Sequence, residues 1–284
     1  MKLGVQSLGW YVLRAADPLP LIHFYRDRLG LTELRGREYP PDQASAMLWA
    51  GGTTVFEPNR LTTGTLQPQK PASIEQCLFV PVFCSSRMGL TQERMGLKPE
   101  YIQDGTSYFR DPLGFFFGIE SVIGSGALAT PPNTRPLENK LVNLSKLEYR
   151  SPKPETTSTF FKQALGLMPL NEITPNVLNM GDGALLTILK GGDCPEVRVK
   201  DREEAVMVPV FRLYGYEHFV FKMKDMNVSC LQEVDLAGGR IWYGWDPCGV
   251  LFGFQERRPP DPGPEKWTTR LREDLLARQL WQNI

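Results

Sequence analysis

Hydrophobic and polar residues alternate in short stretches along the chain, and these stretches recur. Residues 10–17 alternate as a strand does, and the Asp-Pro pair that follows can open a helix, because aspartate caps a helix and proline fits its first turn. That helix carries Phe24 and ends at Gly30. After a polar loop, residues 47–56 predict two short strands joined by a Gly-Gly turn. The pattern indicates one β-α-β-β-β unit.

The third quarter of the chain repeats the first. Residues 146–150 predict the strand, and residues 157–165 predict the helix, which ends at Gly166. Gly30 and Gly166 are 136 residues apart, and phenylalanines of the two helices keep the same spacing. Residues 176–187 match the hairpin of the first unit. A kept register across a strand, a helix and a helix stop indicates an internal repeat.

The second and fourth quarters also match each other. Residues 107–120 align with residues 242–255, and each segment holds an Asp-Pro-x-Gly turn between two apolar strands. In such a turn proline presets the backbone, aspartate bonds the turn amides and glycine takes the positive φ. Residues 217–225 predict the first strand of the fourth unit, with His218 at its start, before a short helical segment. The chain is therefore expected to hold four units.

Length and charge narrow the function classes. The 284 residues, of which 42% are hydrophobic, suit two domains, and a formal net charge of zero gives no field that attracts nucleic acid or an acidic membrane surface. No stretch reaches the roughly 20 apolar residues of a membrane helix. The N-terminus lacks the apolar segment of a secretion signal, so a cytoplasmic location is expected. The expected partner is a small molecule, and a homodimer is left open.

Composition also predicts the domain boundaries. We expect an N-terminal domain at 1–122, a Gly/Ala/Pro-rich linker at 123–138 and a C-terminal domain at 139–258. Residues 259–284 predict a proline-rich spacer and an amphipathic helix that packs on the body or on a second copy. The five cysteines form no Cys-x-x-Cys pair, so they are interpreted as reduced thiols.

Together these motifs resemble the vicinal oxygen chelate superfamily. The resemblance rests on a strand that ends in Asp, a helix with Phe-Tyr and Leu-Gly, and a later strand pair entered through Asp-Pro-x-Gly, and it spans roughly residues 8–255. That superfamily includes glyoxalase I, extradiol dioxygenases and bleomycin-resistance proteins. The resemblance implies an α+β fold, with four β-α-β-β-β modules in two tandem domains whose curved sheets enclose cavities. Such a cavity usually holds a divalent metal.

The metal ligands that the resemblance implies are mostly replaced in this chain. The first-strand positions are Trp10, Gln76 (or Cys77), Lys146 and His218. The last-strand positions, where glutamate is usual, are Phe56, Gly118, Thr187 and Gly253. The only other histidine, His23, lies in a predicted helix. No metal or other cofactor is therefore expected, and the alternative is a shifted divalent-metal site of His218, Glu148, Glu120 and Gln255.

The residues on the expected concave face suggest a different chemistry. Glycine at two ligand positions would open room for an organic molecule, and aromatic and basic side chains would hold an anionic or aromatic ligand. The predicted catalytic residues are His218, as acid or base, with Lys146, Tyr108 and Tyr243. The predicted substrate-binding residues are Trp10, Arg14, Gln76, Glu148, Arg150, Phe117, Gly118 and Gly253.

Several functions remain open at this stage. The first is a metal-independent lyase, isomerase or cyclase that acts through an enolate-like or phenolate-like anion. The second is a protein that binds and sequesters a drug or metabolite without catalysis. The third is a metal-dependent oxygenase or glyoxalase-like enzyme with the shifted site. A fourth is a scaffold that uses only its surfaces. These alternatives differ in whether a cavity exists and in which charged groups face it.

Overall fold

The fold comes from a computed structural model. It describes residues 4–38, 44–51, 54–61, 70–121, 142–181, 184–192, 198–236 and 239–256. The predicted linker at 123–138 and the predicted C-terminal spacer and helix at 259–284 lie outside the described residues. Among the described residues, no helix is long and apolar enough to cross a membrane.

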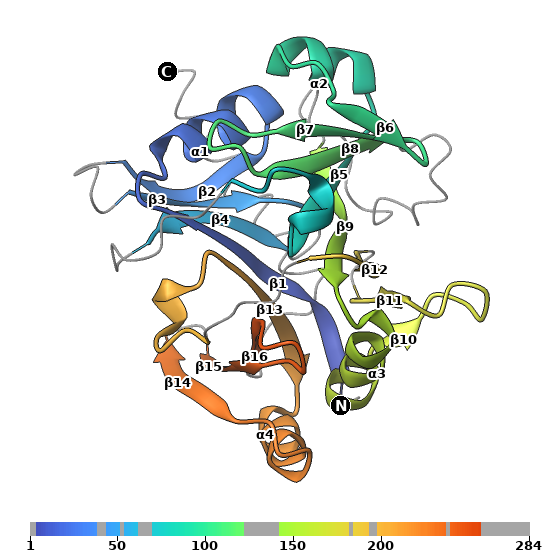
Figure 1. The fold of residues 1–284 in the computed structure, drawn as a ribbon. Coiled ribbons are helices and arrows are strands. Elements are labelled where there is room, and N and C mark those ends of the chain that lie inside the picture. The colour runs from blue at the N-terminus through green and yellow to red at the C-terminus, as the bar shows by residue number, and fades with distance from the viewer. Residues whose placement is uncertain are drawn as a thin grey trace.

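Two eight-stranded mixed sheets form the body of the molecule (Figure 1). We call the first sheet A, with strand order β14-β15-β16-β13-β1-β4-β3-β2, and the second sheet B, with order β10-β11-β12-β9-β5-β8-β7-β6. The strands of sheet A are β1 (Gly4–Ala15), β2 (Thr32–Arg37), β3 (Ser45–Trp49), β4 (Val55–Arg60), β13 (Met207–Tyr214), β14 (Cys230–Leu236), β15 (Gly239–Trp245) and β16 (Leu251–Glu256). The strands of sheet B are β5 (Phe79–Ser85), β6 (Tyr101–Gln103), β7 (Thr106–Arg110), β8 (Phe116–Ser121), β9 (Val142–Ser151), β10 (Met168–Pro169), β11 (Val177–Asn179) and β12 (Leu185–Lys190).

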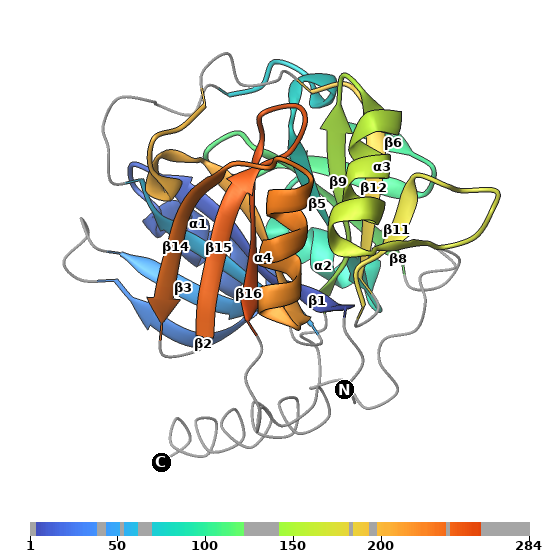
Figure 2. The same cartoon turned by 90° about the horizontal axis from the view of Figure 1, so that it is seen from below.

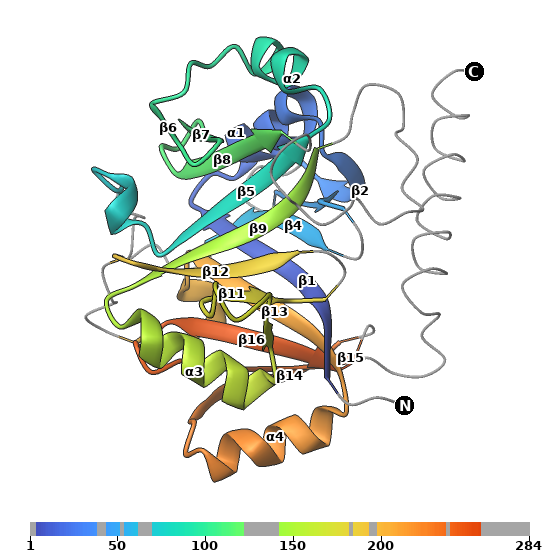
Figure 3. The ribbon, with the colours of Figure 1, turned by 90° about the vertical axis from the view of Figure 1, so that its right-hand side faces the viewer.

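The helices complete four β-α-β-β-β modules, as the repeats predict. They are α1 (Leu19–His23), which continues as the π-helical η1 (Phe24–Leu29), then α2 (Met88–Met95), α3 (Pro154–Leu165) and α4 (Tyr216–Asp225). The 3-10 helices η3 (Ile74–Gln76) and η4 (Arg202–Glu204), both within the described residues, precede β5 and β13. Figures 1 and 3 show α1 beside α2 at one end of the molecule and α3 beside α4 at the other.

Each sheet joins one module from each half of the chain. In sheet A the first module meets the fourth through antiparallel β1 and β13, and in sheet B the third meets the second through antiparallel β9 and β5. Figure 2 shows the orange strands of the fourth module in the same sheet as the blue strands of the first. The expected sequence halves, 1–122 and 139–258, therefore do not coincide with the two sheets.

One apolar core lies against a face of both sheets. It includes Tyr11 of β1, Phe83 of β5, Leu147 of β9 and Phe211 of β13, all fully buried. Because strand side chains alternate, the next residues along these strands face the opposite, concave side. The core therefore fixes which residues can line a cavity.

The predicted helix stops and turns are confirmed. Gly30 and Gly166 end their helices in the left-handed conformation, with φ of 93° and 69°. In the first Asp-Pro-x-Gly turn, the Asp111 carboxylate accepts the amides of Leu113 and Phe115 at 2.9 and 3.0 Å. Helix stops and turns depend on a few neighbouring residues, so the sequence alone can predict them.

The predicted strand at 217–225 is wrong, because this segment is α4. Tyr216, Phe219 and Met223 are buried and lie on one face at helical spacing, whereas His218 is exposed. The first strand of the fourth module is β13, an almost continuously buried run earlier in the chain. A similar shift affects the second module, where β5 begins after η3 and the position of Gln76.

Candidate functional site

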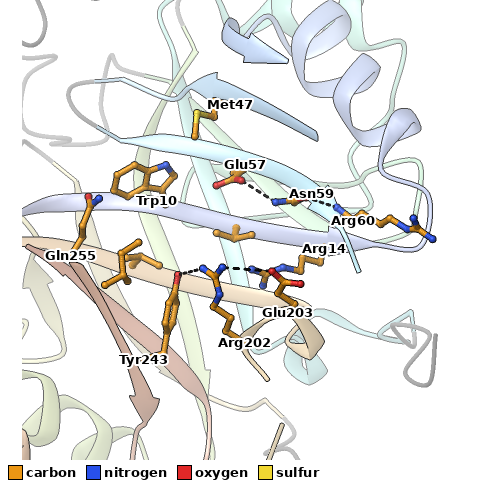
Figure 4. Close-up of a pocket in the computed structure, with 13 residues that line it drawn as sticks. Trp10, Arg14, Met47, Glu57, Asn59, Arg60, Arg202, Glu203, Tyr243 and Gln255 are labelled. Atoms are coloured by element: carbon orange, nitrogen blue, oxygen red, sulfur yellow. Dashed lines mark hydrogen bonds and ion pairs between the residues drawn. The ribbon is translucent and has the colours of Figure 1, made fainter. Parts of the chain in front are cut away.

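A cavity opens on the concave face of sheet A (Figure 4). Its volume of about 430 Å³ falls in the range of pockets that bind small organic molecules. It is lined by Trp10, Val12, Arg14, Met47, Glu57, Asn59, Arg60, Arg202, Glu203, Val210, Ile241, Tyr243 and Gln255. Three arginines against two glutamates make its charged lining net positive.

The apolar part of the lining comes from the centre of the sheet. Trp10 and Val12 alternate with core residues along β1, and Val210 faces Trp10 across the β1–β13 pair. Ile241 on β15 continues this surface. The Arg212 guanidinium carbon lies 4.6 Å from the centre of the Trp10 indole ring, a cation–π contact on this side of the sheet. The cavity therefore has an apolar body with charged groups at its edge.

Glu57 is the carboxyl group of this cavity that the strands hold in place. It lies on β4 directly beside Val12 of β1, and Asn59 donates a hydrogen bond to its Oε1 at 2.9 Å. Burial raises the pKa of Glu57, and the nearby charges of Arg14 and Arg202 and the bond from Asn59 oppose this shift only in part. A carboxyl group whose pKa is raised above its ordinary value holds a proton more readily, so it can both accept and return one.

Two arginines and a tyrosine form the polar end of the cavity, which Figure 4 shows opposite Gln255. Arg14 is only 5% exposed and donates to the carbonyl of Ala205 at 3.0 Å. Arg202 donates from Nη1 to the Tyr243 hydroxyl at 3.3 Å. Burial lowers the pKa of Arg14, and Arg202 lowers it further as a like charge. Glu203 Oε1 lies 3.5 Å from Nη2 of Arg202 and balances part of this charge, but the two guanidinium groups outnumber it, so this end of the cavity favours an anion.

Close packing explains why glycine occupies two of the expected ligand positions. A Cβ on Gly253 would lie 2.9 Å from Cδ1 of Tyr243, and a Cβ on Gly118 would lie 2.8 Å from the Thr106 methyl carbon. The expectation that these glycines make room for a ligand is wrong at the strand itself. They let side chains of the neighbouring strand lie flat over the sheet.

Sheet B carries a second polar cluster on its concave face, and its groups bind one another. The Glu148 carboxylate accepts the Tyr108 hydroxyl at 2.6 Å and Arg150 Nη2 at 2.8 Å. Lys146 Nζ lies 3.1 Å from Glu120 Oε2 and 3.9 Å from Glu148 Oε1. Glu148 is only 2% exposed. The Glu148 carboxylate therefore fills, on the concave face of sheet B, the place that a bound anion could otherwise take.

The predicted site residues thus divide between the two sheets. Trp10, Arg14 and Tyr243 line the sheet A cavity, with Gly253 beside Tyr243 on the next strand, whereas Lys146, Tyr108, Glu148, Arg150 and Gly118 lie on sheet B. They form two separate sites, not the single set that the sequence suggested.

Three predicted residues lie on the wrong surfaces. His218 is exposed on α4, Gln76 is exposed in η3, and Phe117 is fully buried in the core on the opposite face of β8. His218 and Gln76 were misplaced because β13 ends before His218, whereas β5 begins after Gln76. Phe117 alternates with the two concave-face residues Phe116 and Gly118.

Sequence reasoning missed Glu57 and Arg202. The last-strand position was assigned to Phe56, which is 1% exposed in the core, and the next residue along β4 faces the cavity. A strict alternation count from the apolar core positions would have found Glu57. Arg202 comes from η4, outside every repeated strand, and the repeat carries no signal for it.

The side chains do not fit the divalent metal that the resemblance implies. No group of three or more His, Cys, Asp or Glu side chains in the described part of the chain could hold a metal ion. Glu57 stands among arginine charges, and cations already neutralise the two glutamates of sheet B. The alternative set is also wrong, because His218 lies on α4, Gln255 on sheet A, and Glu120 and Glu148 on sheet B.

Comparison with solved structures gives the fold a known counterpart. Glyoxalase I from Zea mays superposes with a TM-score of 0.59 at 15% sequence identity, over 96% of this chain and 97% of that chain. A proposed dioxygenase from Bacillus subtilis superposes with a TM-score of 0.60 at 14% identity, over 91% of this chain and 87% of that chain. No protein-family model and no curated protein matches the sequence. The chain has the glyoxalase/dioxygenase fold.

Proposed function

We propose that this chain, built on the glyoxalase/dioxygenase fold, is an acid–base enzyme of the lyase or isomerase type. Its substrate is an anionic small molecule bound in the sheet A cavity, and Glu57 transfers the proton. The observation that carries the proposal is Glu57 itself, a carboxyl group with a raised pKa in a cavity that also presents Arg14 and Arg202. Perturbed carboxyl groups in clefts are characteristic of catalytic sites.

The proposed step uses only groups of this chain. The Glu57 carboxylate accepts a proton from a carbon next to a carbonyl, and the C–H electron pair moves to form an enolate. The guanidinium groups of Arg14 and Arg202 stabilise the negative charge of the bound anion and of the enolate oxygen that develops next to it. Protonated Glu57 then returns the proton to another carbon in an isomerisation, or a leaving group departs in an elimination.

The pH dependence follows from the direction of the pKa shift. Glu57 must be ionised to accept the proton, and burial raises its pKa above the ordinary carboxyl value. The rate should therefore rise with pH through a range above that of an exposed glutamate. His218 is exposed on α4 and plays no part in this scheme.

Exchange of carbon-bound protons in D₂O tests the proposal. Wild-type protein is incubated with a panel of 2-oxo and 3-oxo carboxylates, and loss of the proton signal next to the carbonyl is followed by ¹H NMR. Glu57→Gln should slow the exchange by roughly a hundredfold or more, the usual contribution of a general base. His218→Ala is the control and should exchange at the wild-type rate.

Three results would reject this proposal. Equal exchange rates in wild-type protein and Glu57→Gln would remove Glu57 from the chemistry. Binding of the panel without any exchange would favour the alternative, a protein that sequesters its ligand. Loss of exchange in His218→Ala would return the proton transfer to the residue that the sequence first suggested.

A further inference from the structure

The two concave faces are copies of one arrangement. β1 pairs with β13 and β4 as β9 pairs with β5 and β12. The backbone amide of Arg14 donates to the Val206 carbonyl at 2.7 Å, and the amide of Arg150 donates to the Leu78 carbonyl at 2.8 Å. This matched bond at the edge of each strand pair fixes the same register in both sheets.

The same three residue types occur at the matched positions. Sheet A has Arg14, Tyr243 and Gly253, with the tyrosine paired to the glycine across β15 and β16. Sheet B has an arginine, Arg150, and a tyrosine that pairs with a glycine across β7 and β8, Tyr108 with Gly118. The arginine and the tyrosine therefore face the same part of the concave surface in each sheet.

The central residue of the two arrangements differs between the sheets. Val12 faces Val208 across its strand pair, and Glu148 faces Val80 in the same way. In sheet B the Glu148 carboxylate occupies the concave face, held by Arg150 at 2.8 Å and the Tyr108 hydroxyl at 2.6 Å. In sheet A the valine leaves that volume to the cavity.

From this duplication we infer that the sheet A cavity binds the carboxylate group of its ligand between Arg14 and Tyr243, where Glu148 places its own carboxylate in sheet B. The inference rests on the proposed function, and it names the substrate class: a small carboxylic acid with an apolar or aromatic body. Tyr243 is prepared for this role. Its hydroxyl oxygen accepts a hydrogen bond from Arg202, so its proton can be donated to the carboxylate.

The remaining differences between the sheets agree with an organic ligand. Lys146 and Thr106 of sheet B correspond to Trp10 and Ile241 of the cavity, so sheet A has apolar side chains where sheet B has polar ones. Arg202 adds a second cation at the carboxylate end. Because Glu57 lies beside Val12 across β1 and β4, the ligand carbons next to the carboxylate lie beside the proposed base.

Substitution at Val12 tests the carboxylate site without knowledge of the substrate. Both variants are made in the Glu57→Gln background, because Glu57 lies beside position 12 and would repel a new carboxylate there, whereas the matching neighbour of Glu148 is the neutral Thr187. In that background Val12→Glu should supply the missing carboxylate in sheet A, and Val12→Gln has nearly the same volume without the charge. We expect a higher Tm for Val12→Glu than for Val12→Gln at neutral pH. An equal or lower Tm for Val12→Glu would overturn the inference, whether or not a ligand is at hand.

Binding of benzoate, with neutral benzamide as control, gives the second readout. Titration calorimetry should show benzoate binding to wild-type protein, benzamide binding at least about tenfold more weakly, and no benzoate binding to Val12→Glu. Tyr243→Phe should weaken benzoate and leave benzamide unchanged. Benzoate binding that persists in Val12→Glu, or no preference for benzoate over benzamide, would overturn the inference. Benzoate has no exchangeable proton next to its carboxyl group, so this result is independent of proton transfer by Glu57.

Discussion

The hydroxyl of Tyr25 donates a hydrogen bond to the carboxylate of Asp111, 3.4 Å away and 86 positions later in the chain. Tyr25 belongs to the module that enters sheet A, and Asp111 begins a turn of sheet B. In the fourth module, Asp246 likewise accepts the hydroxyl of Tyr149, which lies on β9 of sheet B. Each Asp-Pro-x-Gly turn therefore both shapes its own hairpin and links the two sheets.

Asp111 should make stability depend on pH. Burial raises its pKa from 3.8 to about 7 in the folded protein. The folded state then holds the proton more tightly than the unfolded state, so the stabilisation is present at low pH and is lost as pH rises from about 4 to 7. The effect is at most roughly 4 kcal/mol.

The variant Asp111→Asn removes this titration and keeps an oxygen for the turn amides. Its free energy of unfolding, measured in urea between pH 5 and pH 8, should change less with pH than that of wild-type protein. Asp104→Asn, at an exposed turn position, is the control and should keep the wild-type slope. Identical slopes for Asp111→Asn and wild-type protein would contradict the prediction.

Two buried tyrosines, Tyr149 on β9 and Tyr11 on β1, allow the effect of the hydrogen bond between the sheets to be separated from the effect of burial alone. Both rings are fully buried on the core face of a central strand, but only the Tyr149 hydroxyl reaches an aspartate, while the Tyr11 hydroxyl has no hydrogen-bond partner among the described residues. Tyr149→Phe should lower the free energy of unfolding by about 1–3 kcal/mol, because the buried carboxylate of Asp246 loses its donor. Tyr11→Phe should cost little. Equal losses in the two variants would refute the link.

A structural feature could be predicted from the sequence when it depends on neighbouring residues, and it could not when it depends on segments far apart in the chain. The stop at Gly166 and the turn at Asp246 depend on a few neighbouring residues, and both were predicted. The face of a strand depends on register, and a slip of one residue from Glu57 to Phe56 hid the cavity carboxylate. Which modules share a sheet depends on contacts between distant segments, such as β1 with β13, and no local pattern encodes that pairing.

The misread segment at His218 shows the same limit. Residues 219–221 are a short apolar run, Phe-Val-Phe, between polar residues, and a run of this length fits a strand as well as a helix segment. Their helical form depends on Phe219 and Met223, which pack into the core at helical spacing. Over so short a segment the two periods cannot be told apart without knowing what the segment packs against.

Removal of the sheet B carboxylate should be costly and partly reversible by added anion. Glu148→Ala leaves the buried Arg150 and the nearby Lys146 without this partner, which should cost about 3–5 kcal/mol of the free energy of unfolding. Formate, added at constant ionic strength against chloride, should restore part of the loss by occupying the same place. Glu172→Ala, at an exposed position away from this cluster, should show neither the loss nor the recovery. A full loss that formate does not relieve would show that this face does not accept a free carboxylate.

Gly253 should be intolerant of even one added methyl group. A Cβ there would lie 2.9 Å from Cδ1 of Tyr243 and 3.1 Å from the carbonyl oxygen of Trp242, so Gly253→Ala must push the tyrosine ring off the strand. We expect a loss of about 1–3 kcal/mol in stability, as overpacking usually causes, together with weaker benzoate binding, because the Tyr243 hydroxyl leaves its place. Gly89→Ala in α2 is the matched control, since a Cβ there meets nothing within 4 Å and alanine favours a helix by about 1 kcal/mol. Stability is read from urea unfolding and affinity from calorimetry, and a Gly253→Ala protein with wild-type benzoate affinity would show that the position of Tyr243 does not matter for binding.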